Sequence, residues 1–549
     1  MRTSFIELNA RERARSLLDE GTFEEFLGPF DRMKSPWLQP QGVVPQSDDG
    51  VVIARGTMRG ARTVVISVEG MFQGGSIGEV SGAKIACALD LAREDCERGL
   101  RTCAILLLET GGVRLQEANL GLAVIAEIQS SIISLQEHTP VIGVIAGMVG
   151  CFGGMGISAG LCSYLIATRA ARLGLNGPEV IEQEAGIEEF DSADRQMIWN
   201  VTGGKQRYET GLIDDLVEDD VQAIRCAISR IQQSGPNPTY RSAEVAKYLG
   251  LLTVDKFHPA PEAKAIANSS GVDQSPLDRG RSSRGRIWFE ALAKVASRGR
   301  CGSVLAGNAD LGGDAACFLA VVPDPGNRFP RARAGELGLE EGWNLAYHIR
   351  EVIAQDRFQE RRRPIIAIVD VPSQAYGRQE ELLGIFLACA ASVNAYADAR
   401  LAGHPVISLV VGHAVSGGFL AHGYQANRIL ALDDPGVVIH AMGKLAAARV
   451  TRRSVAELDA LAAKILPLSY DVRGFAQLGI LYELFQVMSP EAPSAADIVK
   501  VQESLLRAIA DARRGPKDLS SRLANPIAIK ARKATIEVRR MLAVQWRGS

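Results

Sequence analysis

One sequence pattern occurs twice in this chain. The segment HTPVIGVIAGMVGCFGGMGISAG covers residues 138–160, and the segment HPVISLVVGHAVSGGFLAHG covers residues 404–423. Each starts as an apolar run with the length of a buried strand, reaches a pair of glycines, and continues in a pattern typical of a buried helix. Such a repeat, placed in both halves of a 549-residue chain, predicts two copies of one structural unit.

The repeat extends to the segments that precede it. AILLLETGGVRLQEANLGLAVIAEI covers residues 104–128, and PIIAIVDVPSQAYGRQEELLGIFLACA covers residues 364–390. Each pattern predicts an apolar strand that ends in an acid, Glu109 or Asp370, followed by a tight loop and a helix. Buried strands that alternate with helices indicate an α/β fold, so we expect two homologous domains of ββα units. We expect Glu109 and Asp370 to cap the following helices.

The boundary between the two domains is expected in IANSSGVDQSPLDRGRSSRGR, residues 266–286, which is rich in Ser, Gly, Pro, Asp and Arg. Its apolar content is too low for a core, which favours a linker. We therefore assign residues 1–270 to the first domain, 271–285 to the linker and 286–549 to the second domain.

Composition excludes several classes of protein. A net charge of −2 gives no global attraction to nucleic acid or lipid. The nine cysteines include no C-x-x-C pair, so neither a zinc site nor a disulfide framework is expected, and no other metal is predicted.

The polar N-terminus lacks the apolar core of a signal peptide, which favours a reducing cytoplasm. Residues 141–168 carry no charge and have the length of a membrane span, but their glycines favour a buried strand and helix, so no membrane is expected.

Glycine at a strand-to-helix step has a chemical use. The first N–H groups of a helix have no internal acceptor, and glycine lets a ligand oxygen approach them closely. Two such N–H groups that converge on one oxygen form an oxyanion hole. The alternative is that these glycines only allow helix and strand to pack closely. The chain has no P-loop, no G-x-G-x-x-G with its acid and no G-x-S-x-G elbow, so other phosphate sites and a serine hydrolase are disfavoured.

Several motifs resemble a known family. GMFQGGSIGEVSGAKIACALDLA (70–92), ETGGVRLQEA (109–118), GCFGGMGISAG (150–160) and LGLNGPEVIE (173–182) resemble the β half of a carboxyltransferase, and VDVPSQAYGRQEELLGI (369–385) and VSGGFLAHGYQANRILAL (415–432) resemble its α half. The wider group is the crotonase superfamily, and the specific resemblance is to biotin-independent malonate decarboxylase with its β and γ subunits fused. DVPSQ stands where many carboxyltransferases carry Asp-x-Pro-Gly, and the chain has no biotinyl Met-Lys-Met site.

The resemblance implies decarboxylation of a malonyl thioester through an enolate, whose charge an oxyanion hole stabilises. It implies that Gly112 or Val113, with Gly153 and Gly154, holds the thioester oxygen, while Ser416, Gly417 and Gly418 line the opposing wall. The expected substrate-binding residues are Gly111, Arg114, Tyr376, Gly377 and His413. The proton donor stays open among Ser373, Tyr376, His413 and His422.

The resemblance also implies partners. The malonyl group would sit on an acyl carrier protein that bears a CoA-like prosthetic group, and a separate transferase would exchange malonyl for acetyl. No cofactor is expected on this chain itself, and a homo-oligomer is possible. The basic segment 512–540 either docks the carrier or forms a solvated helix face. Two other functions stay open: a carboxyltransferase component of a biotin-dependent acyl-CoA carboxylase or decarboxylase, and a non-catalytic scaffold.

Overall fold

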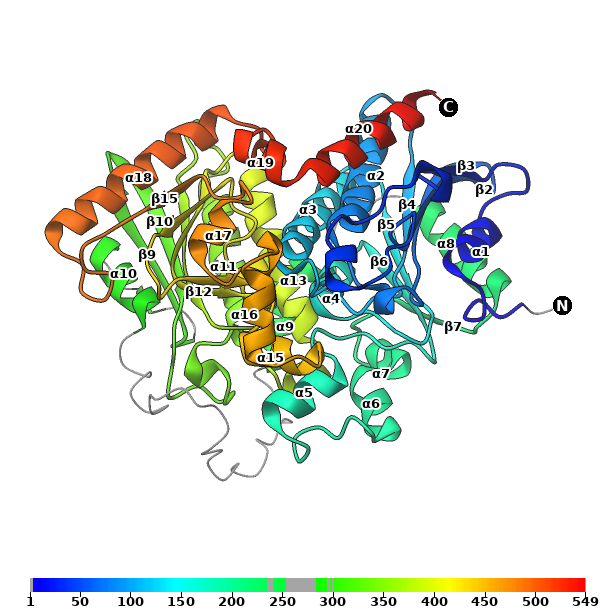
Figure 1. The fold of residues 1–549 in the computed structure, drawn as a ribbon, viewed down its shortest axis with the longest axis horizontal. Helices are drawn as coiled ribbons and strands as arrows, with labels where there is room; N and C mark the ends of the chain where they lie inside the picture. The colour runs from blue at the N-terminus through cyan, green and yellow to red at the C-terminus, as the bar shows by residue number, and fades with distance from the viewer. Residues whose placement is uncertain (1–2, 235–239, 253–282, 294–296, 299–300, 549) are drawn as a thin grey trace.

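The computed structural model describes residues 3–234, 240–252, 283–293, 297–298 and 301–548, and the statements below concern this part of the chain. Two twisted sheets stand on either side of a central group of helices, and further helices cover their outer faces (Figure 1). Each half of the chain contributes one sheet, so the expected pair of homologous α/β domains is confirmed.

The first half forms a sheet of seven described strands in the spatial order β1-β2-β3-β4-β5-β6-β7. The first three strands pair antiparallel and the rest pair parallel. Its elements are α1 (Ala10–Leu17), β1 (Glu24–Phe26), η1 (Pro29–Asp31), η2 (Gln39–Gln41), β2 (Val51–Met58), β3 (Ala61–Val68), η3 (Gln73–Gly75), α2 (Glu79–Glu97), β4 (Cys103–Leu107), α3 (Ala118–Gln136), β5 (Val141–Ile145), α4 (Gly153–Leu161), β6 (Tyr164–Thr168), α5 (Pro178–Ala185), α6 (Arg195–Thr202), α7 (Gly204–Glu209), β7 (Asp215–Val217), α8 (Val221–Ser234), η4 (Arg241–Ala243) and α9 (Val245–Leu252).

The second half repeats this arrangement in a sheet of eight described strands, with the main order β15-β13-β12-β11-β10-β9-β8 and with β14 beside β12. Its elements are α10 (Arg284–Leu292), β8 (Ser297–Arg298), β9 (Val304–Leu311), β10 (Asp314–Val321), η5 (Ala332–Ala334), α11 (Leu339–Gln355), β11 (Ile365–Val371), α12 (Arg378–Leu382), α13 (Ile385–Leu401), β12 (Val406–Val415), α14 (Ser416–Ala421), β13 (Arg428–Leu432), β14 (Val438–His440), α15 (Lys444–Val450), α16 (Val455–Ala462), η6 (Leu466–Leu468), α17 (Val472–Ala476), β15 (Glu483–Phe485), α18 (Ala495–Arg514), η7 (Ser520–Arg522), α19 (Pro526–Ala531) and α20 (Lys533–Gly548).

The structural repeat is longer than the repeat that the sequence analysis found. Each half also contains an antiparallel hairpin, β2–β3 in the first and β9–β10 in the second, which precedes the first parallel strand. The hairpins turn at Arg59–Gly60 and Gly312–Gly313, and all four residues have positive φ. These dipeptides between apolar runs were the available signal, because such turns require left-handed backbone.

The glycine-rich helices of the two halves meet in the centre of the molecule. Helices α3 and α4 of the first half pack against α13 of the second, and α4 also contacts α14. One continuous apolar core includes residues of both halves, while a separate cluster lies between the first sheet and α1 and α8. The strand-to-helix connections of the two repeated segments therefore lie at one interface between the halves.

The uncharged stretch 141–168 is not one helix. It contains strand β5, helix α4 and strand β6, as the strand-and-helix interpretation of its start predicts. Among the described helices, α3 is long and apolar enough to cross a bilayer, and 94% of its most apolar window is buried inside the protein.

The C-terminal helix crosses back to the first half. Helix α20 packs along α2 and buries Val538, Leu542 and Trp546 (Figure 1). Within the basic segment 512–540, the Arg532 guanidinium lies 2.8 Å from Glu127 and is completely buried. Arg532 and Arg539 of this segment hold the two halves together, whereas Arg514, Lys530, Lys533 and Arg540 are exposed, so docking of the carrier on this segment stays a prediction.

The predicted linker, residues 271–285, lies mostly outside the described residues. Its last residues, Arg284 and Gly285, already belong to α10. The assignment of residues 1–270 and 286–549 to two domains stays a prediction at the level of its boundaries.

Candidate active site

Neither of the two strand-ending acids caps the helix that follows it in the chain. Glu109 accepts hydrogen bonds from the N–H groups of Val149 and Gly150, and Arg13 donates to its second oxygen at 2.9 Å. Asp370 accepts from the N–H group of His413, near the end of β12, and from the N–H group of Gly285, in the first turn of α10. The prediction that each acid caps the helix that follows it is wrong: Glu109 binds the loop after β5, and Asp370 binds β12 and the start of α10.

In the first half, two loops meet backbone to backbone. Gly112 has φ +99° and Gly153 has φ +61°, and an ideal Cβ on Gly153 would lie 3.1 Å from Cα of Gly112 and 3.8 Å from N of Val113. The Gly112 N–H donates to Oγ1 of Thr110, and the Gly153 N–H donates to the Leu175 carbonyl at 2.8 Å. The N–H groups of Val113 and Gly154 donate no hydrogen bond within the described residues, so they are the open donors of this half.

The second half presents the same loops with different residues. Ile77 bridges Val113, and Leu337 bridges Gln374 in the same parallel pattern, so Gln374 is the structural counterpart of Val113. Ser416 opens α14 with φ +58°, as Gly153 opens α4, which makes Gly417 the counterpart of Gly154.

In the second half, a side chain of the opposite loop occupies one donor of the counterpart pair, while the Gln374 N–H donates no hydrogen bond within the described residues. The Gly417 N–H donates to Oε1 of Gln374 at 2.9 Å. Gly418 serves packing, because a Cβ there would lie 2.7 Å from the Ser373 carbonyl oxygen. The second loop therefore lacks the free donor that Gly154 provides in the first.

A segment of the first half connects the two loops. Asn176 accepts a hydrogen bond from Nε2 of Gln374 at 2.8 Å and donates through Nδ2 to the Ala375 carbonyl at 2.9 Å. The N–H groups of Leu175 and Asn176 both donate to Oε1 of Glu381, at 3.1 and 2.6 Å. The second half thus binds both N–H groups of residues 175–176 and the Asn176 side chain, while the Leu175 carbonyl stays bonded to Gly153 of the first half.

A buried ion pair supports this junction. Arg207 lies 3.6 Å from the Glu381 carboxylate and donates to the Glu381 carbonyl at 2.7 Å. Burial raises the pKa of Glu381 to about 7, although Arg207 and the two N–H donors act in the opposite direction. Burial lowers the pKa of Arg207 to about 10. Glu381 is therefore a group whose charge changes near neutral pH.

The structure separates the four polar groups considered as proton donors. Both ring nitrogens of His422 are engaged, by Tyr396 and by the Ile368 carbonyl, and burial lowers its pKa to about 4. His413 is half exposed beside Asp370 on the outer end of β12. Ser373 and Tyr376 stay within the loop that faces the glycines, and burial raises the pKa of Tyr376 despite a hydrogen bond with Ser373.

Arg114 is not available to a phosphate. Its side chain is completely buried, 2.7 Å from Asp49 and 2.8 Å from Glu117. Two carboxylates already compensate this cation, so the expectation that Arg114 binds substrate does not hold in this structure. Gly111, by contrast, is exposed at the open side of the loop, and Gly377 has extended backbone where α12 begins.

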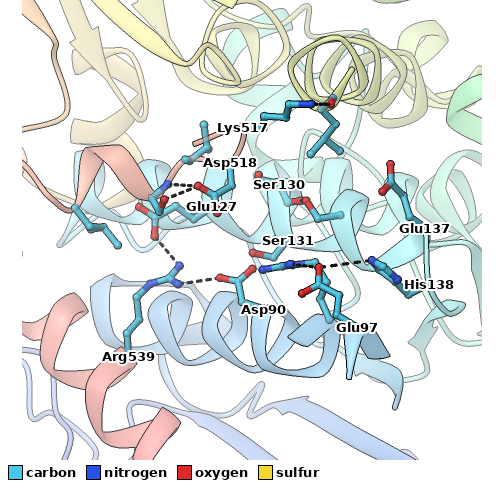
Figure 2. A pocket seen from close by; sticks show the side chains of 16 residues that line it. Asp90, Glu97, Glu127, Ser130, Ser131, Glu137, His138, Lys517, Asp518 and Arg539 are labelled. Atoms are coloured by element: carbon cyan, nitrogen blue, oxygen red, sulfur yellow. Dashed lines mark hydrogen bonds and ion pairs between the residues drawn. The ribbon is translucent and has the colours of Figure 1, made fainter. Parts of the chain in front are cut away.

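A separate cavity of about 240 Å³ lies between the halves, among α2, α3, Arg539 and residues 517–523 (Figure 2). Three serines of α3 and many charged side chains line it, and no residue of the two glycine loops does. Asp90 and Glu127 bind Arg539 here, so these charges already have partners.

Known proteins resemble both halves of the chain. A family model described as malonate decarboxylase gamma subunit (MdcE) matches residues 332–546. The chain is 44% identical over 240 residues to malonyl-S-ACP:biotin-protein carboxyltransferase MADC of Malonomonas rubra, which covers 42% of this chain and 76% of that protein. It is 38% identical to MADD of the same organism over 162 residues, 29% of this chain and 56% of that protein.

One solved structure, a Pseudomonas malonate decarboxylase hetero-tetramer in complex with malonate, contains a chain that is 58% identical to this one. The match covers 47% of this chain and 94% of that chain, with a TM-score of 0.46. On the sequence identity across most of MADC and the gamma-subunit match in the second half, the chain belongs to the malonate decarboxylase family of carboxyltransferase-like proteins.

Proposed function

We propose that this chain decarboxylates a malonyl thioester carried on an acyl carrier protein, giving the acetyl thioester and CO₂ without biotin. One observation carries the proposal: the first half keeps the Val113 and Gly154 N–H groups open, while the matching position of the second half is filled by Gln374. The family relatives named above act on malonyl-S-ACP or contain bound malonate, which supports the substrate class.

The reaction needs a place for negative charge. When the bond between C2 and the carboxylate carbon breaks, the electron pair moves into the thioester and produces an enolate oxygen. The Val113 and Gly154 N–H groups would donate to that oxygen, and the start of α4 adds a positive field. A proton then reaches C2, so malonyl thioester and one proton give acetyl thioester and CO₂. Ser373 and Tyr376 are the hydroxyl groups that the loop geometry leaves for this step.

The second loop does not offer a complete pair of N–H donors to a carboxyl acceptor, because its Gly417 N–H is occupied. A carboxyl transfer would require a second carbonyl compound, such as the ureido ring of biotin, to be held opposite the thioester. The Gly417 N–H, which would hold such a carbonyl, already donates to Gln374. CO₂ then leaves as product instead of passing to biotin.

The rim of the open loop suits a thioester arm. Loop 70–75 packs on Glu109 and Val149, and Gly74 accepts a hydrogen bond from the Gly111 N–H. Met71 and Met148 extend from these loops and are 87% and 75% exposed. We take this apolar rim as the contact for the carrier's CoA-like prosthetic group, which reaches the chain as part of the substrate.

The proposal also concerns how the subunits of the enzyme are organised. A chain of the Pseudomonas MdcD–MdcE hetero-dimer is 55% identical over 48% of this chain. We infer that this polypeptide fuses the two subunits that such an enzyme divides, and that its partners are the acyl carrier protein and a malonyl/acetyl transferase.

The test is turnover of purified chain with malonyl-carrier and, in parallel, malonyl-CoA, without ATP or biotin, followed by mass spectrometry. Conversion of malonyl-carrier to acetyl-carrier supports the proposal. A third arm adds free biotin and a biotinylated carrier domain. Turnover that appears only in that arm would assign the chain to the biotin-dependent carboxyltransferases instead.

A further inference from the structure

We infer that Gln374 and Asn176 form a positioning pair, through which the second half of the chain aligns the oxyanion donors of the first half. The inference rests on the proposed function for its kinetic test. Its structural basis is a chain of hydrogen bonds that runs from the second glycine loop to the first without passing through solvent-exposed groups.

The chain of hydrogen bonds starts at the Gly417 N–H, which donates to Gln374. Gln374 donates to Asn176, at 2.8 Å. Asn176 is bonded covalently to Leu175, whose carbonyl accepts the Gly153 N–H at 2.8 Å. Because Gly153 directly precedes Gly154, the position of the Leu175 carbonyl sets the direction of the open Gly154 N–H.

Only one arrangement of the two amides satisfies this network. The Gly417 N–H can only donate, so Oε1 of Gln374 must face it and Nε2 must face Asn176. Asn176 must then accept through Oδ1, which leaves Nδ2 to donate to the Ala375 carbonyl. A pair of amides with a single consistent orientation fixes distances and directions, which an apolar contact would not do.

Glu381 holds the same segment from the other side. Its Oε1 accepts from both Leu175 and Asn176, and its Oε2 would lie 2.6 Å from a Cβ on Gly174, so a larger residue at 174 would displace this carboxylate. Segment 174–176 is therefore fixed at both edges by the second half. This gives the second half, whose own Gly417 N–H is occupied, a part in the reaction.

The main test compares Gln374→Met, which keeps the volume and removes both hydrogen bonds, with the wild-type chain. Gln425→Met is the matched control, because Gln425 is also a buried amide that crosses between the halves, to the Ala126 carbonyl at 2.9 Å. We expect kcat for malonyl-carrier to fall about 10- to 100-fold in Gln374→Met with little change in KM, because misplaced donors lose mainly transition-state stabilisation. The control should keep its kcat.

A second variant tests the hydrogen bond itself, without a change in the shape of the side chain. In Gln374→Glu, the bridge can form only when the carboxyl is protonated, because Asn176 presents an acceptor to it. The ratio of its kcat to that of the wild type should therefore rise as the pH falls. The titratable and charged groups around this loop are Glu336, Arg331, Tyr376, Glu380, Glu381 and Arg207. Dividing the variant's pH profile by the wild-type profile removes their own contribution.

Hydrogen exchange gives a readout that needs no turnover. The amides of residues 151–155 should exchange faster in Gln374→Met than in the wild type or in Gln425→Met. Equal exchange rates together with wild-type kcat would overturn the positioning role. Absence of turnover in the wild-type chain would instead overturn the proposed function, while the exchange measurement would still decide the present inference.

Discussion

Replacing Gly153 by alanine tests the first donor loop most directly. An alanine at φ +61° costs about 1–2 kcal/mol of stability, since left-handed backbone crowds its Cβ. That Cβ would also lie 3.1 Å from Cα of Gly112 and 3.4 Å from the Gly111 carbonyl oxygen, so one loop must shift by a few tenths of an ångström. The shift separates the N–H groups of Val113 and Gly154.

Loss of one such donor costs about 3–4 kcal/mol of transition-state stabilisation, which lowers kcat roughly 10²–10³-fold. The assay is steady-state turnover of malonyl-carrier, with thermal unfolding measured on the same sample. Gly99→Ala is the matched control, because Gly99 also has a positive φ of +85° but lies outside the loops of the site, and a Cβ there meets nothing within 4 Å. Full turnover in a folded Gly153→Ala variant would refute the assignment of the donors to this loop.

Three further predictions concern charge. Because burial raises the pKa of Glu381 to about 7 and its carboxylate holds Leu175 and Asn176, kcat should fall as the pH drops below about 7, and Glu381→Gln should flatten that profile. Burial also raises the pKa of Glu341 to about 7 from 4.5; the stability that this group contributes is complete below 4.5 and is lost as the pH rises through 7. Glu341→Gln should remove about 3 kcal/mol of that decline, measured by chemical denaturation at several pH values. Arg114→Met leaves Asp49 and Glu117 buried without their cation and should destabilise the fold by about 3–5 kcal/mol, while the affinity for malonyl-carrier, measured by calorimetry, stays unchanged.

The sequence predicts the fold well where the apolar pattern is periodic. Strands β4, β5, β11 and β12, and the helices that follow them, stand where the alternating runs and the glycine pairs indicate. The hairpins before them were missed because their turn dipeptides are short. The prediction that Glu109 and Asp370 cap the helices that follow them was wrong because a carboxylate at a strand end has several N–H groups within reach. Which one it binds depends on the neighbouring strand, which local pattern does not reveal.

The site is predictable only in part for the same reason. The glycines of both loops are visible in the sequence. Leu175, Asn176 and Glu381, which join the loops, lie within segments 173–182 and 369–385 that carry the family resemblance, yet nothing in those segments shows that they contact one another. Their role depends on the pairing of two halves that are about 200 residues apart in the chain. The meaning of Gln374 likewise appears only when its structural alignment with Val113 is known, because the two residues share neither chemistry nor neighbouring sequence.

The return of α20 to the first half has a consequence for synthesis on the ribosome. Helix α2 ends at Glu97, while its covering helix ends at Gly548. At about 5–20 residues per second, translation of the intervening chain takes roughly 25–90 s. During that interval the surface around Cys87 and Asp90, which Arg539 later covers, is open to other molecules. Until α20 has been synthesised, the first half therefore exposes a surface that the folded protein covers.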